Sequence, residues 1–153
     1  MQAVLGAEWL IKLGDDDLLG LTAEYFYNGA GYADDDLYLW LALQGSLRPL
    51  YLGRHYAALG VALPGPGSLN DTTFTLSALA NLSDQSTLVR LDYVVRFLSD
   101  LSFNAYVMAH PGRYGELRFR AEIPPLPIDE SLSEGLVIPA SWLDLGVGLR
   151  MSF

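Results

Sequence analysis

The chain has 153 residues, of which 51% are hydrophobic, and its formal net charge is −9. This length fits a single domain that can bury a substantial core, and the acidic balance argues against nucleic-acid binding, which needs a basic surface. The absence of Cys excludes disulfides and thiolate metal sites, and no motif indicates a metal or another cofactor.

The first 28 residues predict a β-hairpin. Over residues 3–13, apolar side chains occupy every second position, as in a strand with one apolar and one polar face. The stretch 14–17 combines Gly14 with three Asp residues and predicts a tight turn. Residues 18–28 resume the alternation, and Tyr25 and Tyr27 fall at the far end of the hairpin, where an interfacial aromatic belt would lie.

Residues 29–49 interrupt this alternation. Segment 34–45 begins with candidate N-cap residues, continues with apolar residues and ends in Gly45, which predicts a short helix. A strand over 37–43 is the alternative. A third strand is predicted at 50–63, and the Pro-Gly repeat at 64–67 ends regular structure.

Alternation then recurs in the second half of the chain. Further strands are predicted at 72–82, 87–98, 102–110 and 141–153, with turns at 83–85 and 99–101. Residues 115–122 also alternate. If these strands crossed a membrane, an eighth crossing at 115–122 would put the carboxy terminus on the outer side, whereas the final strand is expected to end on the inner side. We therefore expect this segment in a loop or as an extension of neighbouring strands. Residues 123–138 contain three Pro and predict an irregular loop.

The length of these strands favours a membrane-spanning sheet. A tilted strand needs ~9–11 residues to cross a bilayer, whereas strands of soluble proteins average about five or six. The connections 14–17, 64–71 and 99–101 fall at one edge, and 29–49, 83–86 and 111–140 at the other. Such a division is typical of barrels with short inner turns and long outer loops. The sequence thus predicts an all-β, antiparallel up-and-down transmembrane β-barrel or part of one, with about seven to eight long strands and a short helix in an outer loop.

The last thirteen residues carry a resemblance to a known class. Apolar residues occupy alternate positions back from the end of the chain: Phe153, Met151, Leu149, Val147, Leu145 and Leu143. This resembles the closing strand of Gram-negative outer-membrane β-barrel proteins, in which a terminal Phe is the signal that the assembly machinery reads. The resemblance implies that Phe153, Met151 and Leu149 form the assembly signal. It also implies a location in the cell outer membrane, with outer-membrane lipid and the barrel-assembly machinery as partners.

The positions opposite the apolar ones hold the charges. Their phase would point nine side chains toward the barrel interior: Glu8, Lys12, Glu24, Arg54, Arg90, Asp92, Arg96, Asp144 and Arg150. Because charge facing lipid is costly, this common phase supports the barrel. These residues would either line a polar pore, in which Arg90, Arg96 and Arg150 attract anions, or neutralise one another in a filled interior.

Resemblance to porin-like proteins implies passive passage of small polar solutes, or a structural membrane role, and no enzyme activity. Two alternatives come from other classes: an outer-membrane barrel enzyme acting on lipid, and a soluble lipocalin-like barrel that binds an apolar ligand. Barrel phospholipases use a His with a Ser and an Asn. The only histidines, His55 and His110, fall in separate predicted strands, and no matching serine motif accompanies them.

Seven strands do not fit a complete bacterial barrel. Bacterial single-chain barrels have an even number, and eight is about the smallest. We therefore expect residues 1–153 to be a single β-barrel domain that forms the carboxy-terminal part of a larger barrel. Its first and last strands would then pair with other barrel strands or with further copies of the chain.

Overall fold

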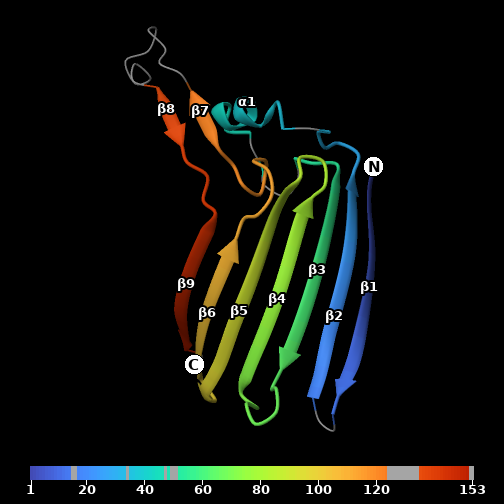
Figure 1. Ribbon diagram of the computed structural model, residues 1–153, viewed down its shortest axis with the longest axis vertical. Coiled ribbons are helices and arrows are strands. Elements are labelled where there is room, and N and C mark those ends of the chain that lie inside the picture. The colour runs from blue at the N-terminus through green and yellow to red at the C-terminus, as the bar shows by residue number, and fades with distance from the viewer. Residues whose placement is uncertain (15–16, 34, 47, 49–51, 124–134, 152–153) are drawn as a thin grey trace.

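The computed structural model describes the chain except for residues 15–16, 34, 47, 49–51, 124–134 and 152–153 (Figure 1). Seven long strands form one antiparallel sheet in the order β1-β2-β3-β4-β5-β6-β9. Their bounds are β1 Gln2–Leu13, β2 Asp17–Asn28, β3 His55–Pro64, β4 Thr72–Asn81, β5 Ser86–Leu98, β6 Leu101–Ala109 and β9 Leu143–Met151. Neighbours in the sheet are therefore neighbours in sequence, apart from the step from β6 to β9. The predicted all-β, antiparallel, up-and-down arrangement is confirmed.

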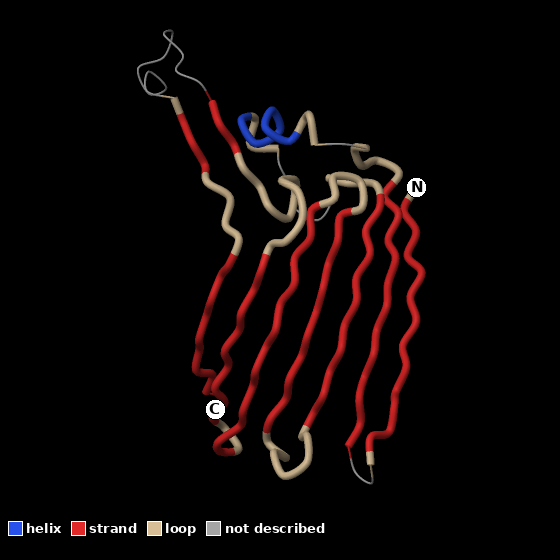
Figure 2. The backbone as a smooth tube through the Cα atoms, viewed as in Figure 1, coloured by secondary structure: helices blue, strands red, loops and turns tan. Residues whose placement is uncertain are grey.

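The sheet is open. Within the described residues, β1 pairs only with β2, and β9 pairs only with β6. The closed form of the predicted barrel is thus not what this chain adopts. Instead, the seven strands lie side by side as a single layer with β1 and β9 at its two edges (Figure 2).

The strand register sorts the side chains onto two faces. The apolar face comprises the odd-numbered residues of β1, β2, β3, β5, β6 and β9 together with the even-numbered residues of β4. Within the strands its side chains are apolar except for Asp17, His55, Thr72 and Thr87, which lie at strand ends. The face is uncovered: on β9, Leu145, Val147 and Leu149 are 69%, 79% and 74% exposed. The opposite, mixed face is called the polar face below.

The connections divide between two ends of the sheet as the strand count predicts. The turns β1–β2, β3–β4 and β5–β6 lie at one end, called the turn end, and the connections β2–β3, β4–β5 and β6–β9 lie at the other, called the loop end (Figure 1). The predicted short helix is confirmed as α1 (Tyr38–Leu43), which lies over the loop end. Among the described residues, no helix has the length and apolarity that crossing a membrane requires.

Two sequence predictions need correction. The third strand begins at His55 rather than at residue 50, and residues 49–51 lie outside the described part of the chain. The irregular loop predicted at 123–138 contains pairing: β7 (Ala121–Ile123) and β8 (Leu136–Ile138) form a short antiparallel ladder. The consecutive apolar residues Leu-Val-Ile of β8, two of them β-branched, suit a strand, and the prolines that suggested a loop lie between the two strands. Segment 115–122 is not a long strand, so the division into two ends holds.

Packing is concentrated at the loop end rather than along the sheet. The buried apolar residues are Tyr38, Leu52, Tyr56, Leu117, Ala121 and Ile123. They come from α1, the connections and the adjacent end of the sheet. The middle of the sheet, by contrast, is a single layer, and none of the other described helices or strands packs on its apolar face.

Candidate functional site: the polar face of the sheet

The predicted interior charges gather on one face. Eight of them lie within strands, and the register places all eight on the polar face: Glu8, Lys12, Glu24, Arg90, Asp92, Arg96, Asp144 and Arg150. Arg54, the ninth, precedes β3 at the loop end, where its Nε donates a hydrogen bond to the Gly31 carbonyl at 2.8 Å. The alternation in the sequence thus located a real charged surface.

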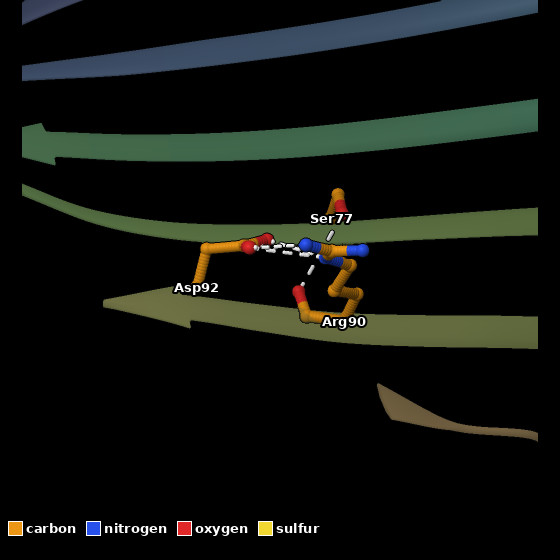
Figure 3. A network of polar contacts seen from close by, with 3 residues as sticks. All are labelled: Ser77, Arg90 and Asp92. Atoms are coloured by element: carbon orange, nitrogen blue, oxygen red, sulfur yellow. Dashed lines mark hydrogen bonds and ion pairs between the residues drawn. The ribbon is translucent and has the colours of Figure 1, made fainter. Parts of the chain in front are cut away.

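Arg90 and Asp92 neutralise each other at the centre of this surface. They are two residues apart on β5 and therefore point to the same side. Arg90 Nε lies 2.8 Å from Asp92 Oδ2, and its Nη2 lies 2.7 Å from Oδ1 (Figure 3). The Ser77 hydroxyl on β4 donates to the Arg90 carbonyl at 3.5 Å. Of the three arginines predicted to attract anions, Arg90 is thus already paired.

Tyr106 extends this cluster across two further strands. The Arg90 guanidinium carbon lies 4.1 Å from the centroid of the Tyr106 ring, a cation–π contact. The ring itself lies over Gly146 on β9, its partner in the register, so a Cβ there would overlap the ring. Asn104 lies over Gly148 in the same way. Glycine on one strand lets the large side chain of the next lie along the sheet instead of standing up from it.

Arg96 and Arg150 form a second group near the turn end. Ser102 on β6 pairs in register with Arg96 on one side and Arg150 on the other. The three residues line a hollow of about 340 Å³, which Asp71 and Asp100 also border. Within the described residues, neither arginine has a carboxylate within ion-pair distance. Of the three arginines predicted to attract anions, these two thus form no ion pair with a described carboxylate.

The polar face is therefore graded in charge along its strands. Lys12, Arg96 and Arg150 lie toward the turn end. Glu24 and Asp144 lie toward the loop end. The central Arg90 is locally neutralised. The sequence predicted the face but not this gradient, because the gradient depends on which residues share a level in the register.

The two histidines do not form a catalytic group. His55 lies on the apolar face, with its Nδ1 2.6 Å from the Tyr25 hydroxyl. At the loop end, His110 Nε2 lies 2.8 Å from Asp144 Oδ2, and the Ser141 hydroxyl donates to Asp144 Oδ1 at 2.9 Å. The carboxylate thus stands between the imidazole and the hydroxyl, whereas a nucleophile must contact its base directly. Among the described residues, no three His, Asp or Glu side chains could hold a metal ion.

A buried polar network at the loop end was not predicted. Asn81 is fully buried, and its Nδ2 donates to Asp84 Oδ2 at 3.0 Å and to Glu116 Oε2 at 2.9 Å. The Tyr56 hydroxyl also donates to Glu116 Oε2, at 2.5 Å. Tyr38 lies against the same group: burial raises the pKa of its phenol, and the negative charge of Asp84 adds to the rise. Two buried carboxylates are thus held by hydrogen bonds from Asn81 of β4 and Tyr56 of β3.

The network joins the connections to the sheet. Asp84 Oδ2 accepts the backbone N–H of Glu116 at 2.8 Å, and the Ser86 hydroxyl accepts that of Leu117 at 3.1 Å. Gly115 packs directly against Asp84, where a Cβ would overlap the carboxylate. In the sequence, residues 83–86 predicted only a tight turn. Glu116 lies more than thirty residues away, so no local pattern links it to Asp84.

The predicted assembly signal lies at the end of the sheet edge. Leu149 and Met151 are exposed on the apolar face of β9, and Phe153 lies outside the described residues. No protein-family model, no curated protein and no solved structure matches the chain. The resemblance of the last thirteen residues to outer-membrane proteins therefore stays a prediction.

Proposed function

We propose that the chain forms part of the wall of an outer-membrane β-barrel whose polar face lines a passive path for small polar solutes. The division of the two faces carries this proposal. One face is apolar across seven strands, and every charged side chain of those strands except Asp17 lies on the other face. A large uncovered apolar surface is rare on soluble proteins, whereas lipid chains would cover it and leave the charges out of contact with lipid.

Strand length supports the same proposal. β6 and β9 have nine residues each, and β5 has thirteen. A tilted strand needs ~9–11 residues to cross the hydrocarbon layer. The two longest connections, β2–β3 and β6–β9, both lie at the loop end, which fits the usual orientation, with the loop end outside the cell. In this orientation the strand end that carries the assembly signal faces the periplasm.

The layout of the polar face favours an open path over a filled interior. Tyr106 and Asn104 lie along the sheet over glycines, which keeps these side chains low and leaves space above them. The Arg90–Asp92 pair needs no charge from across a lumen. A wall that pairs Arg90 with Asp92 and leaves Arg96 and Arg150 without an ion pair to any described carboxylate suits a passage for small polar solutes.

Fluorescence quenching tests contact with lipid. A variant that keeps only Trp9, which is 53% exposed on the apolar face, would be refolded in phospholipid bicelles with brominated acyl chains. We expect strong quenching, because bromine quenches indole on contact. Moving the indole one residue onto the polar face, with Trp9→Phe and Leu10→Trp, should reduce it severalfold. Equal and weak quenching of both variants would reject the membrane proposal and favour a soluble barrel.

Thiol labelling tests the water-lined face. Because the chain has no Cys, single cysteines can be placed at neighbouring positions on opposite faces of β4. In bicelles, Ser77→Cys should react with a charged, water-soluble thiol reagent at least tenfold faster than Leu76→Cys. Faster reaction at position 76 would mean that the apolar face meets water, which contradicts the proposal.

A further inference from the structure

The two open edges of the sheet specify what completes it. Because each of the seven strands is antiparallel to its neighbour, the first and the seventh run in the same direction. β1 and β9 both run from the loop end to the turn end (Figure 1). A strand placed between them can be antiparallel to both only if it runs from the turn end to the loop end.

The edges need partners if the proposed function holds. Alternate residues of an edge strand point their N–H and C=O groups outward. β1 has twelve residues and β9 has nine, and no described residue pairs with their outer sides. In hydrocarbon these groups have no water to bond, so open edges are not tolerated there.

Direct pairing of β1 with β9 in one chain meets two obstacles. The pair would be parallel, while every other pair of this sheet is antiparallel. The resulting lumen would also be too small, because a barrel of eight strands is only just wide enough for its inward side chains. Here the polar face carries Tyr56, Tyr106, Arg90 and Arg150, which a seven-stranded barrel would have to enclose.

A second copy of the chain meets the same directional obstacle. If copies are related by rotation about the barrel axis, β1 of one meets β9 of the next, and these strands are again parallel. A two-fold axis across the strands would make the pairs antiparallel but would invert one copy. Its buried network of Asn81, Asp84 and Glu116 would then lie on the opposite side of the membrane.

We propose that β1 and β9 bind amphipathic β-strands supplied by polypeptide outside residues 1–153, and that these strands are odd in number. The strands adjoining β1 and β9 run from the turn end to the loop end, with apolar side chains on the apolar face. One added strand closes a filled barrel of eight, and three or more widen the lumen. This inference rests on the proposed function, since only hydrocarbon makes the edges intolerable.

The proposal requires an odd number of added strands, which we call the parity rule. This rule can be tested with copies of the chain's own strands. One extended protein carries a second copy of residues 72–81 before Met1, which adds one strand entering β1 at the loop end. The other carries a copy of residues 55–81, which adds two strands. Both use the same flexible linker and are refolded in bicelles beside the unextended chain.

Disulfide formation reports which edges meet. Cysteines are placed at Leu145, Val147 or Leu149 of β9 and at the copied counterparts of Leu76, Ala78 or Ala80. In the two-strand protein, a second set is placed in the outermost added strand. The Ala7→Cys and Ala23→Cys pair, directly opposite in the β1–β2 register, gives the reference yield for adjacent strands.

We expect the one-strand extension to reach at least half of the reference yield and the two-strand extension to stay below a tenth of it. The unextended chain with Ala7→Cys and Val147→Cys should form no bond within or between chains. An intramolecular bond in that protein would overturn the proposal in favour of self-closure. A bond between chains would overturn it in favour of a second copy, and equal closure by one and two added strands would refute the parity rule. Trp9 quenching is also measured in the one-strand extension, in which β1 has a partner on both sides. Strong quenching there without closure would overturn the proposal on added strands alone, whereas weak quenching there would reject the membrane proposal itself.

Discussion

Gly146 shows how a single missing side chain shapes the polar face. The Tyr106 ring occupies the space above it and stacks on Arg90. We expect Gly146→Ala to lower the free energy of unfolding by about 1–3 kcal/mol, because the ring must move and lose this contact. Gly20, also within a strand of the polar face, is the control: a Cβ there meets nothing closer than 3.8 Å.

Gly20→Ala should leave stability unchanged or raise it by up to about 1 kcal/mol, since alanine restricts the unfolded chain more than glycine. Urea titration in bicelles, followed by tryptophan fluorescence, measures both changes. If steric overlap is the cause, Gly146→Ala should cost little stability in a chain that already carries Tyr106→Ser, and the two substitutions should show a clear coupling energy. Additive effects of the two substitutions would show that the ring does not depend on Gly146.

Charge at the turn end can be measured at Ser102, which pairs with Arg96 and Arg150. A cysteine at position 102 should react faster with a negatively charged thiol reagent than with a positively charged one, by roughly three- to tenfold at low salt. The combined Arg96→Gln and Arg150→Gln substitutions should abolish this preference. Salt at 1 M should have a similar effect, because both arginines are exposed and their charge is screened.

The control for this preference is a cysteine at position 77, beside the Arg90–Asp92 pair. There the two reagents should react at similar rates, because the adjacent charges cancel. A preference of the same size at positions 77 and 102 would mean that the net field of the molecule, rather than the two arginines, selects the reagent. Preference for the positive reagent at position 102 would show that Asp71 and Asp100 dominate the hollow.

At the scale of elements, Asn81 attaches the loop-end connections to the sheet. Its amide is the shared donor for the carboxylates of Asp84 and Glu116. Asn81→Ala should lower the free energy of unfolding by about 1–3 kcal/mol, or more, because buried acceptors lose their partner. It should also expose segment 112–118 to limited proteolysis.

Ser77→Ala is the matched control for Asn81→Ala. Its hydroxyl makes only a 3.5 Å hydrogen bond on the same polar face, so the change in stability should stay within about 0.5 kcal/mol. Cleavage of segment 112–118 should then match that of the unaltered chain. Equal sensitivity of Asn81→Ala and the unaltered chain to protease would show that the connections are held by other contacts.

The strands could be predicted from sequence because their signal is local. The alternation over 3–13 and 18–28 predicts both that the backbone is extended and on which face of the sheet each side chain lies. The loop-end network could not be predicted in this way, because Asp84 and Glu116 meet only after the sheet has set the distance between their segments. The pairing of β7 with β8 was not predicted either. Each strand has only three residues and thus a weak local signal, and the prolines between them indicated a loop.

The outline of the candidate site could be predicted because it too follows from the local alternation of side chains along each strand. Strand phase alone placed eight charges on one face, but phase carries no information on which of them touch. The ion pair of Arg90 with Asp92 follows from side-chain geometry, and the position of Arg96 beside Ser102 follows from levels in the register. The sequence predicted a barrel or part of one, and it could not decide between them, because closure depends on the partners of two edges and not on any strand's own pattern.

For the whole molecule, the proposed lipid contact makes the height of the apolar face the quantity that sets which membrane thickness fits. Strand β9 contributes nine residues, which at about 3.3 Å each and a tilt of about 40° span roughly 23 Å. This is thinner than the ~30 Å of an average bilayer and close to the apolar band of about 25 Å in outer-membrane barrels. The chain in bicelles of 12-carbon lipids should therefore unfold at higher urea concentration than in bicelles of 18-carbon lipids. Mismatch costs only fractions of a kcal/mol per Å, so the shift should be modest but graded with lipid chain length.

The Leu76→Arg variant, with a charge at the centre of the apolar face, should be destabilised by about 2–4 kcal/mol in both lipids. Its neighbour Thr75→Arg, on the polar face opposite Asp92, should behave like the unaltered chain. A urea midpoint that rises with lipid chain length, or equal tolerance of arginine at positions 75 and 76, would contradict a lipid-covered apolar face.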